Sequence, residues 1–196
     1  FNPIHPGSPH TGVIATIEDI TERKRMEEEL RKSEEKYRDI FNNSVWGIFQ
    51  STQEGTFLSC NAAFACTFGY DSPEELITSI TDIANQYYAN PEDRRKYLGM
   101  FQERGTAENF EFKAKRKDGS EIWVINSSRI VKDEDGNPLF LEGAVKEITD
   151  RKQAEEKLKE SEQKFSASFM SSPAILIITT MDEGRYVEVN QAFTEF

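Results

Sequence analysis

Histidine and cysteine are the side chains best suited to metal binding and nucleophilic catalysis, and this chain contains few of either. Its 196 residues include two His and two Cys. His5 and His10 lie in a segment rich in Pro, and no cluster of cysteine, histidine or carboxylate residues surrounds them. Because a metal site needs several such ligands, we interpret both as loop histidines and predict no metal site.

The two cysteines are also poor candidates for chemistry. Cys60 directly precedes Asn61, a predicted helix cap, and Cys66 falls on an apolar helix. We interpret both as buried structural thiols. Two cysteines do not form a disulfide framework, so a reducing compartment is the simpler assumption. We therefore predict a cytoplasmic location.

Enzyme motifs are absent from the sequence. It contains no glycine-rich phosphate loop, no Ser or Cys in a nucleophile motif, no kinase phosphoacceptor helix and no cyclase motif. We predict a non-catalytic segment, and turnover by the isolated chain would contradict this interpretation. Any output enzyme would lie elsewhere in a longer protein.

Charge and hydropathy narrow the choice of partners. A formal net charge of −11 repels nucleic acid and anionic lipid heads. The longest wholly apolar run, Ala174–Ile178, is far shorter than the ~20 residues that cross a bilayer. We expect no nucleic acid partner and no membrane contact by this segment.

One segment of the chain occurs twice, and it organises the rest. Residues 19–41 reappear 128 positions later, so that Ile20 corresponds to Ile148 and Thr21 to Thr149. The similarity continues beyond the helix, because Asn61 has a counterpart in Asn190. A period of about 130 residues is the size of a domain, whereas solenoid repeats have a period of about 20 to 50. The chain therefore holds one complete repeat between two incomplete ones.

Each copy of the repeated segment predicts a linker helix, over residues 21–40 and 150–168. Apolar side chains recur at intervals of three and four residues, which is the seam spacing of a coiled coil. We predict that these helices pair in a parallel homodimer. A surface helix packed on its own domain is the alternative, since short isolated helices are marginal. The predicted seam consists of Met26, Leu30, Tyr37, Ile40, Leu158 and Phe165.

Between these helices the pattern predicts an α+β domain. Two strands with a tight turn come first, then short helices capped at Asn61, Ser72 and Asn90, and then three strands joined by turns such as Lys117–Ser120. Strands grouped at both ends imply an antiparallel sheet with the helices on one face. Both parities of the last two strands carry apolar residues, so a flanking helix or a partner chain should cover the other face.

These residues resemble the PAS sensory fold with its C-terminal PAC motif. The resemblance implies a five-stranded antiparallel sheet that cradles short helices around a small pocket. It also implies a place in a prokaryotic signalling protein of the histidine kinase or diguanylate cyclase type. The motifs that carry it are Asn61–Phe64 with Phe68–Tyr70, Arg116–Ser120 with Trp123, and Asp19–Lys24.

The resemblance divides the chain into five parts. Residues 1–20 are the remnant of a preceding PAS domain, 21–40 a linker helix, 41–149 the complete domain, 150–168 a second linker helix, and 169–196 the start of a following domain. The incomplete ends would expose the edges of Val13–Glu18 and Ile175–Val189, and such edges seek partners. We expect them to pair with each other or with a neighbouring chain.

In the PAS family, an Asp-Ile-Thr segment after the last strand passes the state of the domain to the next helix, and its Asp pairs with a basic residue. By resemblance, the first signal junction is Asp19, Ile20 and Thr21. The second is Glu147, Ile148 and Thr149, where Glu stands in place of Asp. The extra methylene puts the geometry of the second ion pair in question.

A ligand pocket is the remaining candidate site. The complete domain has no His for haem and lacks the Cys motif of covalent flavin photosensors, so we predict no cofactor of either kind. A non-covalent flavin or a small metabolite stays open beside an empty or aromatic-filled cavity. Asn126 and Ser128 have the opposite parity to Trp123 and are assigned to the second layer. The candidate lining is Phe49, Asn61, Phe64, Tyr70, Tyr97, Phe101, Phe112, Trp123 and Ile125.

Two functional hypotheses follow from these observations. In the first, the chain is a PAS sensory and relay module that dimerises and transmits a change in its core through the linker helices. In the second, it is a receptor for a small molecule or a flavin. Colour in the purified protein, or a thermal shift with metabolites, would favour the second.

Overall fold

The computed structural model describes residues 19–195, except for the side chains of residues 103 and 104. These residues belong to two units that divide between Asn43 and Ser44. The two histidines and the predicted strand Val13–Glu18 lie outside the described residues.

The first unit contains a single described helix, α1 (Thr21–Asn43), which ends three residues after the predicted boundary. Ion pairs one turn apart join Arg23 to Glu27 at 2.9 Å and Arg25 to Glu29 at 3.1 Å. Each such pair stabilises a helix by only about 0.2–0.5 kcal/mol. None of the residues of α1 is buried, so local interactions and not packing within the unit maintain this helix.

A five-stranded antiparallel sheet forms the centre of the second unit, in the order β2-β1-β5-β4-β3. This is the sheet that the sequence predicts. The edge strand β2 directly precedes the helical segment in the chain, and the edge strand β3 directly follows it. The helices therefore connect one edge of the sheet to the other. The strands are β1 (Gly47–Ser51), β2 (Phe57–Cys60), β3 (Thr106–Lys115), β4 (Glu121–Lys132) and β5 (Pro138–Glu147).

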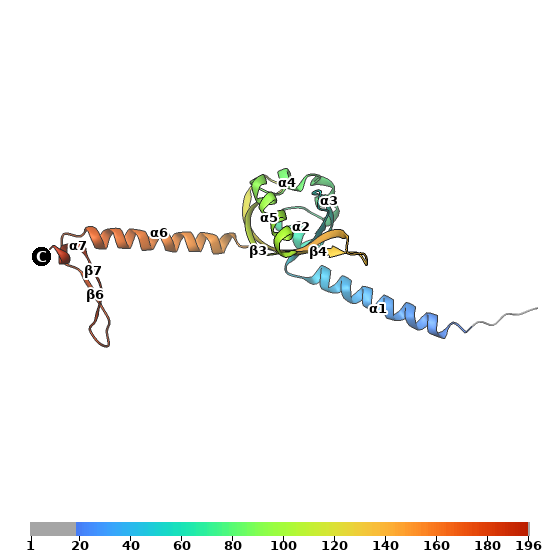
Figure 1. Ribbon diagram of the computed structural model, residues 1–196, viewed down its shortest axis with the longest axis horizontal. Helices are drawn as coiled ribbons and strands as arrows, with labels where there is room; N and C mark the ends of the chain where they lie inside the picture. Colours follow the sequence, from blue (N-terminus) through green and yellow to red (C-terminus); the bar gives the residue numbers. More distant parts are fainter. Residues whose placement is uncertain (1–18, 196) are drawn as a thin grey trace, which may run out of the picture. The chain divides into compact units, whose positions relative to one another are not determined.

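Four helices lie on one side of the sheet (Figure 1). Three of them begin at the predicted caps: the side chains of Asn61, Ser72 and Asn90 each accept a hydrogen bond from a backbone N–H in the first helical turn. The fourth, α4, was not predicted because its four residues are too few to show a helical period. The helices are α2 (Ala62–Thr67), α3 (Pro73–Ser79), α4 (Ile83–Gln86) and α5 (Pro91–Arg104).

Two clusters of buried side chains form the core. The larger one lies between α2, α3, α4 and the inner face of the sheet, and the smaller one between α5 and the strands β3 and β5. Gly47 allows α2 to approach β1 closely, because a Cβ atom at this position would lie 2.9 Å from the Phe64 Cα atom. The helical layer is therefore fixed directly on the sheet.

After β5 the chain continues as α6 (Thr149–Ser171), then β6 (Ile177–Thr179), β7 (Tyr186–Val189) and α7 (Gln191–Thr194). Among the described residues, β6 and β7 pair only with each other. Asn190 caps α7 and bonds to Leu176 N and Ala174 O. The repeat in sequence is thus a repeat in local structure, with a hairpin followed by an asparagine-capped helix.

Candidate functional site

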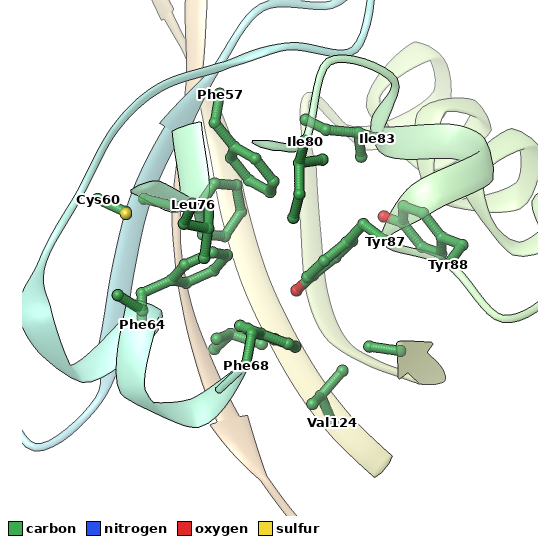
Figure 2. Close-up of a cluster of buried hydrophobic side chains, with 14 of the residues drawn as sticks. Phe57, Cys60, Phe64, Phe68, Leu76, Ile80, Ile83, Tyr87, Tyr88 and Val124 are labelled. Carbon is green, nitrogen blue, oxygen red and sulfur yellow. The ribbon is translucent and has the colours of Figure 1, made fainter. Parts of the chain in front are cut away.

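Aromatic rings fill the space that the sequence predicts as a pocket. Phe49, Phe64 and Phe112 of the predicted lining are all buried in the larger core cluster. The ring centroid of Phe64 lies 4.8 Å from that of Phe68 and 6.0 Å from that of Tyr87. Figure 2 shows the side chains of Phe64, Phe68 and Tyr87 directed toward one another between the helices and the sheet. The centre of the domain is therefore an aromatic core.

Two other predicted residues, Tyr97 and Phe101, belong to the smaller cluster on α5. Their rings meet edge to face at 5.1 Å, and the Tyr97 hydroxyl forms a 2.7 Å hydrogen bond with Ser128 Oγ. Burial raises the pKa of Tyr97, so its hydroxyl stays protonated. Tyr70 is only partly buried and lies under the Lys117 ammonium group at 5.7 Å.

The prediction for Trp123 and Ile125 is wrong. Both project from the outer face of β4 and are only partly buried, whereas Val124 between them is fully buried in the core. The pairing of β3 with β4 sets this parity, because Phe112 pairs with Val124 and Lys113 pairs with Trp123. Directly paired residues share a face of the sheet. Apolar residues at both parities concealed the register from sequence analysis.

The same register reverses the prediction for Asn126 and Ser128, which face the helices and are buried. The Asn126 Oδ1 atom and the Ser51 Oγ atom are buried without a hydrogen-bond partner among the described residues. Leaving a buried polar atom unpaired costs about 1–3 kcal/mol. Two such atoms on the inner face of one sheet therefore require an explanation.

Asn61 acts as a structural cap. Its side chain is fully buried. The Oδ1 atom accepts hydrogen bonds of 2.9 Å from the backbone N–H groups of Ile48 and Phe64, and Nδ2 donates to the Trp46 carbonyl at 3.0 Å. Asn61 thus joins β1 to the start of α2. These bonds occupy its amide and explain its presence without a ligand.

At the predicted second junction, Glu147 forms an ion pair with Arg116 although Glu stands in place of Asp. Glu147 Oε2 lies 2.8 Å from Arg116 Nη2, and Arg116 Nε also donates to the Thr67 carbonyl at the end of α2. On the other side, Glu147 Oε1 accepts a 2.9 Å bond from the Thr149 hydroxyl, which in turn accepts from the Trp123 backbone N–H. A continuous path of hydrogen bonds therefore leads from α2 to the first residue of α6.

A second set of contacts holds the first turn of α6 to the sheet. Glu111 on β3 pairs with Lys152 at 2.6 Å and also with Arg151. The ammonium of Lys152 lies 5.2 Å from the centre of the Trp123 ring. Lys152 first and Arg151 second hold the pKa of Glu111 below its usual value. We call this group, Glu111 with Arg151 and Lys152, the Glu111 clamp.

Comparison with known families decides the assignment of the central domain. The profile described as PAS domain matches residues 44–150, which is more than half of the chain. The chain belongs to the PAS domain family. The match covers all five strands of the central sheet and the four helices, so the PAS domain is the unit that contains both the aromatic core and the second junction.

Similar proteins include kinases that carry such a domain in a longer chain. Sporulation kinase E of Bacillus subtilis (strain 168) is 26% identical over 171 residues, and sensor histidine kinase TmoS of Ectopseudomonas mendocina is 24% identical over 151 residues. The alignments cover 81% and 74% of this chain but only 20% and 15% of those proteins. The PAS domain is thus a sensory signalling module.

Solved PAS structures share this fold. The PAS domain of a protein from Colwellia psychrerythraea has a TM-score of 0.52 at 18% identity and covers 60% of this chain and 98% of its own. A sensory box histidine kinase/response regulator from Burkholderia thailandensis has a TM-score of 0.50 at 20% identity, with 67% and 98% coverage. At these identities the similarity shows the fold alone.

The predicted first junction lies at the start of α1, and the predicted seam lies on α1 and α6. Asp19 Oδ1 accepts a 2.9 Å hydrogen bond from the Thr21 backbone N–H, and bonds with Thr21 lower the pKa of Asp19. Ile20 is exposed, as are all six predicted seam residues on α1 and α6. The pairing of these seams stays a prediction.

The two cysteines of the PAS domain differ in burial. Cys60 is buried, and burial raises its pKa to about 12, whereas Cys66 is exposed. The assignment of Cys66 as a buried thiol is wrong, because it lies on the outer side of α2. Among the side chains that the structure describes, no group of metal-ligating residues occurs, and no helix between residues 19 and 195 is long and apolar enough to cross a membrane.

Sequence analysis missed three of the residues that shape the PAS domain. Tyr87 and Tyr88 are both buried, yet they lie between short helices where no period marks them. Arg94 is buried on α5, three residues before Tyr97 and four before Leu98. The helical period places it on the apolar face, so this signal could have identified it.

Proposed function

We propose that this chain is a relay segment of a sensor kinase, in which the PAS domain passes a change in its core into α6. Its similarity to two named kinases supports the output class. The observation that carries the proposal is the path of hydrogen bonds from Thr67 through Arg116 and Glu147 to Thr149. A shift of α2 against the sheet would move Arg116 and thereby alter the start of α6.

The path has the physical properties that a relay needs. It joins the helical layer to the outgoing helix through charge-assisted bonds, which are short and directional. The Arg116 and Glu147 side chains are each about one third exposed, so water can replace their bond at low cost. A junction of this kind can adopt two arrangements, and both the core and α6 can bias them.

Hydrogen–deuterium exchange on the 196-residue chain tests the relay. Arg116→Met removes the charge and the hydrogen bonds but keeps an apolar stem, and we expect faster exchange in the first turns of α6. Arg129→Met is the matched control, because Arg129 also pairs with a glutamate on β5 (Glu142, 2.5 Å) but has no contact with this path. Equal exchange of α6 in the two variants would overturn the relay.

The relay proposal includes a parallel homodimer that pairs α1 with α1 and α6 with α6. Exposed apolar residues at seam spacing on both helices support it.

A receptor function is the second candidate, and one observation favours it. Asn126 Oδ1 and Ser51 Oγ are buried without a partner among the described residues, and a ligand could satisfy them.

A further inference from the structure

Arg94 is a buried cation without a carboxylate partner. The residue is 6% exposed, and no acidic side chain of the described residues lies within ion-pair distance of it. Its Nη2 atom donates to two backbone carbonyls, Thr52 O at 3.5 Å and Gln53 O at 3.3 Å. Both bonds are long for N–H···O. A buried charge is costly unless it is paired, so this guanidinium can still take an anion.

The surroundings of Arg94 suit a polar ligand headgroup. Its guanidinium lies 5.4 Å from the centre of the Tyr97 ring. Burial raises the pKa of Tyr88 and of Tyr97 while Arg94 acts in the opposite direction, so both hydroxyls remain neutral. The Tyr97 hydroxyl is bonded to Ser128, and the Tyr88 hydroxyl is in hydrogen-bond contact with Arg94. Ser51, with its unpaired buried hydroxyl, directly precedes Thr52 in the chain.

Gln53, the bonding partner of Arg94, lines an apolar cleft that Arg94 does not itself line. It has a volume of about 300 Å³ and is lined mainly by Leu98, Phe101, Ile130, Pro138 and Leu141. Gln53, whose carbonyl accepts from the Arg94 guanidinium, lies on its polar side.

Three further contacts connect the cleft to the buried polar groups. Leu98 follows Arg94 by one helical turn on α5. Phe101 packs edge to face on Tyr97. Leu141 pairs with Ser51 across β5 and β1.

We infer that this cleft binds a small amphiphilic monocarboxylate, whose apolar body lies against Leu98, Phe101 and Ile130 and whose carboxylate pairs with Arg94. A monoanion fits better than a phosphate dianion because the site offers one cation within a chain of net charge −11. A cleft of about 300 Å³ is at the small end of ligand sites. The inference rests on the proposed function in that this ligand would be the signal that the relay transmits.

Isothermal titration calorimetry of the 196-residue chain at pH 7.5 with hexanoate, hexanol and hexylamine tests the inference. We expect saturable binding of hexanoate and at least tenfold weaker binding of the neutral and cationic probes. Arg94→Met should weaken hexanoate binding at least tenfold. Arg95→Met is the matched control, because this neighbouring arginine has a 75% exposed side chain and pairs with Glu92. It should bind hexanoate like the unmodified chain.

Three results would overturn the inference: no binding of hexanoate, equal binding of hexanol, or unchanged binding in Arg94→Met. The comparison of probes needs no substitution, so it decides the question even when Arg94→Met fails to fold. The binding measurement does not depend on α6. If hexanoate does not bind but Arg116→Met still changes exchange in α6, only the ligand inference is wrong. If hexanoate binds but Arg116→Met leaves exchange in α6 unchanged, only the relay proposal is wrong.

Discussion

Two asparagines of this PAS domain show that the same residue type can be fully hydrogen-bonded in one place and keep an unpaired polar atom in another. Asn61 and Asn126 are both fully buried amides. Asn61 accepts from two backbone N–H groups and donates to a carbonyl, whereas Asn126 retains an unpaired Oδ1 atom. Of the two roles predicted for Asn61, cap and ligand contact, the structure thus shows the cap, while Asn126, which was assigned to the outer layer, faces inward with an unpaired oxygen atom.

Replacing Asn61 should therefore destabilise the domain strongly. We expect Asn61→Ala to lower the free energy of unfolding by about 3 kcal/mol, since it removes a helix cap and leaves buried backbone groups unpaired. Asn190→Ala is the matched control, because Asn190 makes corresponding bonds in the C-terminal segment. We expect a smaller loss for this variant, because that segment contributes no residue to the two core clusters. Urea denaturation followed by near-ultraviolet circular dichroism measures both, and an equal loss in the two variants would contradict the assignment.

At the scale of secondary-structure elements, the close approach of neighbouring strands depends on one glycine. A Cβ atom on Gly143 of β5 would lie 2.5 Å from Ser128 Cβ, 2.8 Å from Ser127 O and 3.0 Å from Phe49 Cζ. The backbone oxygen cannot move aside without disturbing the pairing of β4 with β5. Phe49 and Ser128 can therefore face each other over this position only because it lacks a side chain.

Gly143→Ala should lower the free energy of unfolding by about 1–3 kcal/mol, the usual cost of overpacking. Gly99→Ala is the opposite case: Gly99 is inside α5 with no atom within 4 Å of an added Cβ. This substitution should raise stability by about 0.5–1 kcal/mol, because alanine favours the helix. Thermal denaturation of both variants measures the signs, and a stable Gly143→Ala would show that β4 and β5 can separate.

The Glu111 clamp between β3 and α6 should be sensitive to acid. The pKa of Glu111 is lower in the folded chain than its ordinary value of 4.5. Its stabilisation is therefore complete above pH 4.5 and is lost as pH falls through the folded pKa. We expect Glu111→Gln to have a lower melting temperature than the unmodified chain at pH 7, and this difference to shrink below pH 4.5.

Glu121→Gln provides the comparison for the Glu111 clamp. Glu121 is about half exposed and pairs with Lys113 at 3.3 Å, and this ion pair includes no residue of α6. Exposed pairs contribute little, so we expect a smaller difference at pH 7. A melting temperature of Glu111→Gln that matches the unmodified chain at neutral pH would show that the clamp does not stabilise the junction.

At the scale of the whole molecule, the prediction concerns assembly. Leu30 and Leu158 are exposed on helices whose own units leave them uncovered. Burying a leucine side chain is worth about 1.5–3 kcal/mol, so several such residues per helix would support pairing in a second copy. The buried core clusters of the PAS domain thus form without α1, and a second copy of the chain is the partner that we propose for the exposed faces of α1 and α6.

Light scattering after size exclusion measures this assembly. We expect a dimer for the unmodified chain and a monomer, or a dimer at least tenfold weaker, for Leu158→Glu. Gln163→Glu is the matched control, because it adds the same charge to α6 at an exposed position outside the predicted seam. A strict monomer at high concentration, or an equal effect of both substitutions, would contradict the parallel dimer.

The sequence by itself determined the repeat, the order of the strands in the chain, and the three helices with predicted caps. These features follow from local rules: caps, turns and periodicity act over a few residues and are written directly in the chain. The glutamate at the second junction was also visible, and only the bond it makes was in question.

Tertiary structure alone decided which face of β4 points inward, and with it the roles of Trp123, Asn126 and Ser128. A strand with apolar residues at both parities fits either orientation, and its pairing with β3 selects one of them. Arg94 is an intermediate case, because the helical period places it on the apolar face of α5 while its charge suggests solvent. The packing of α5 decides between the two and buries this cation.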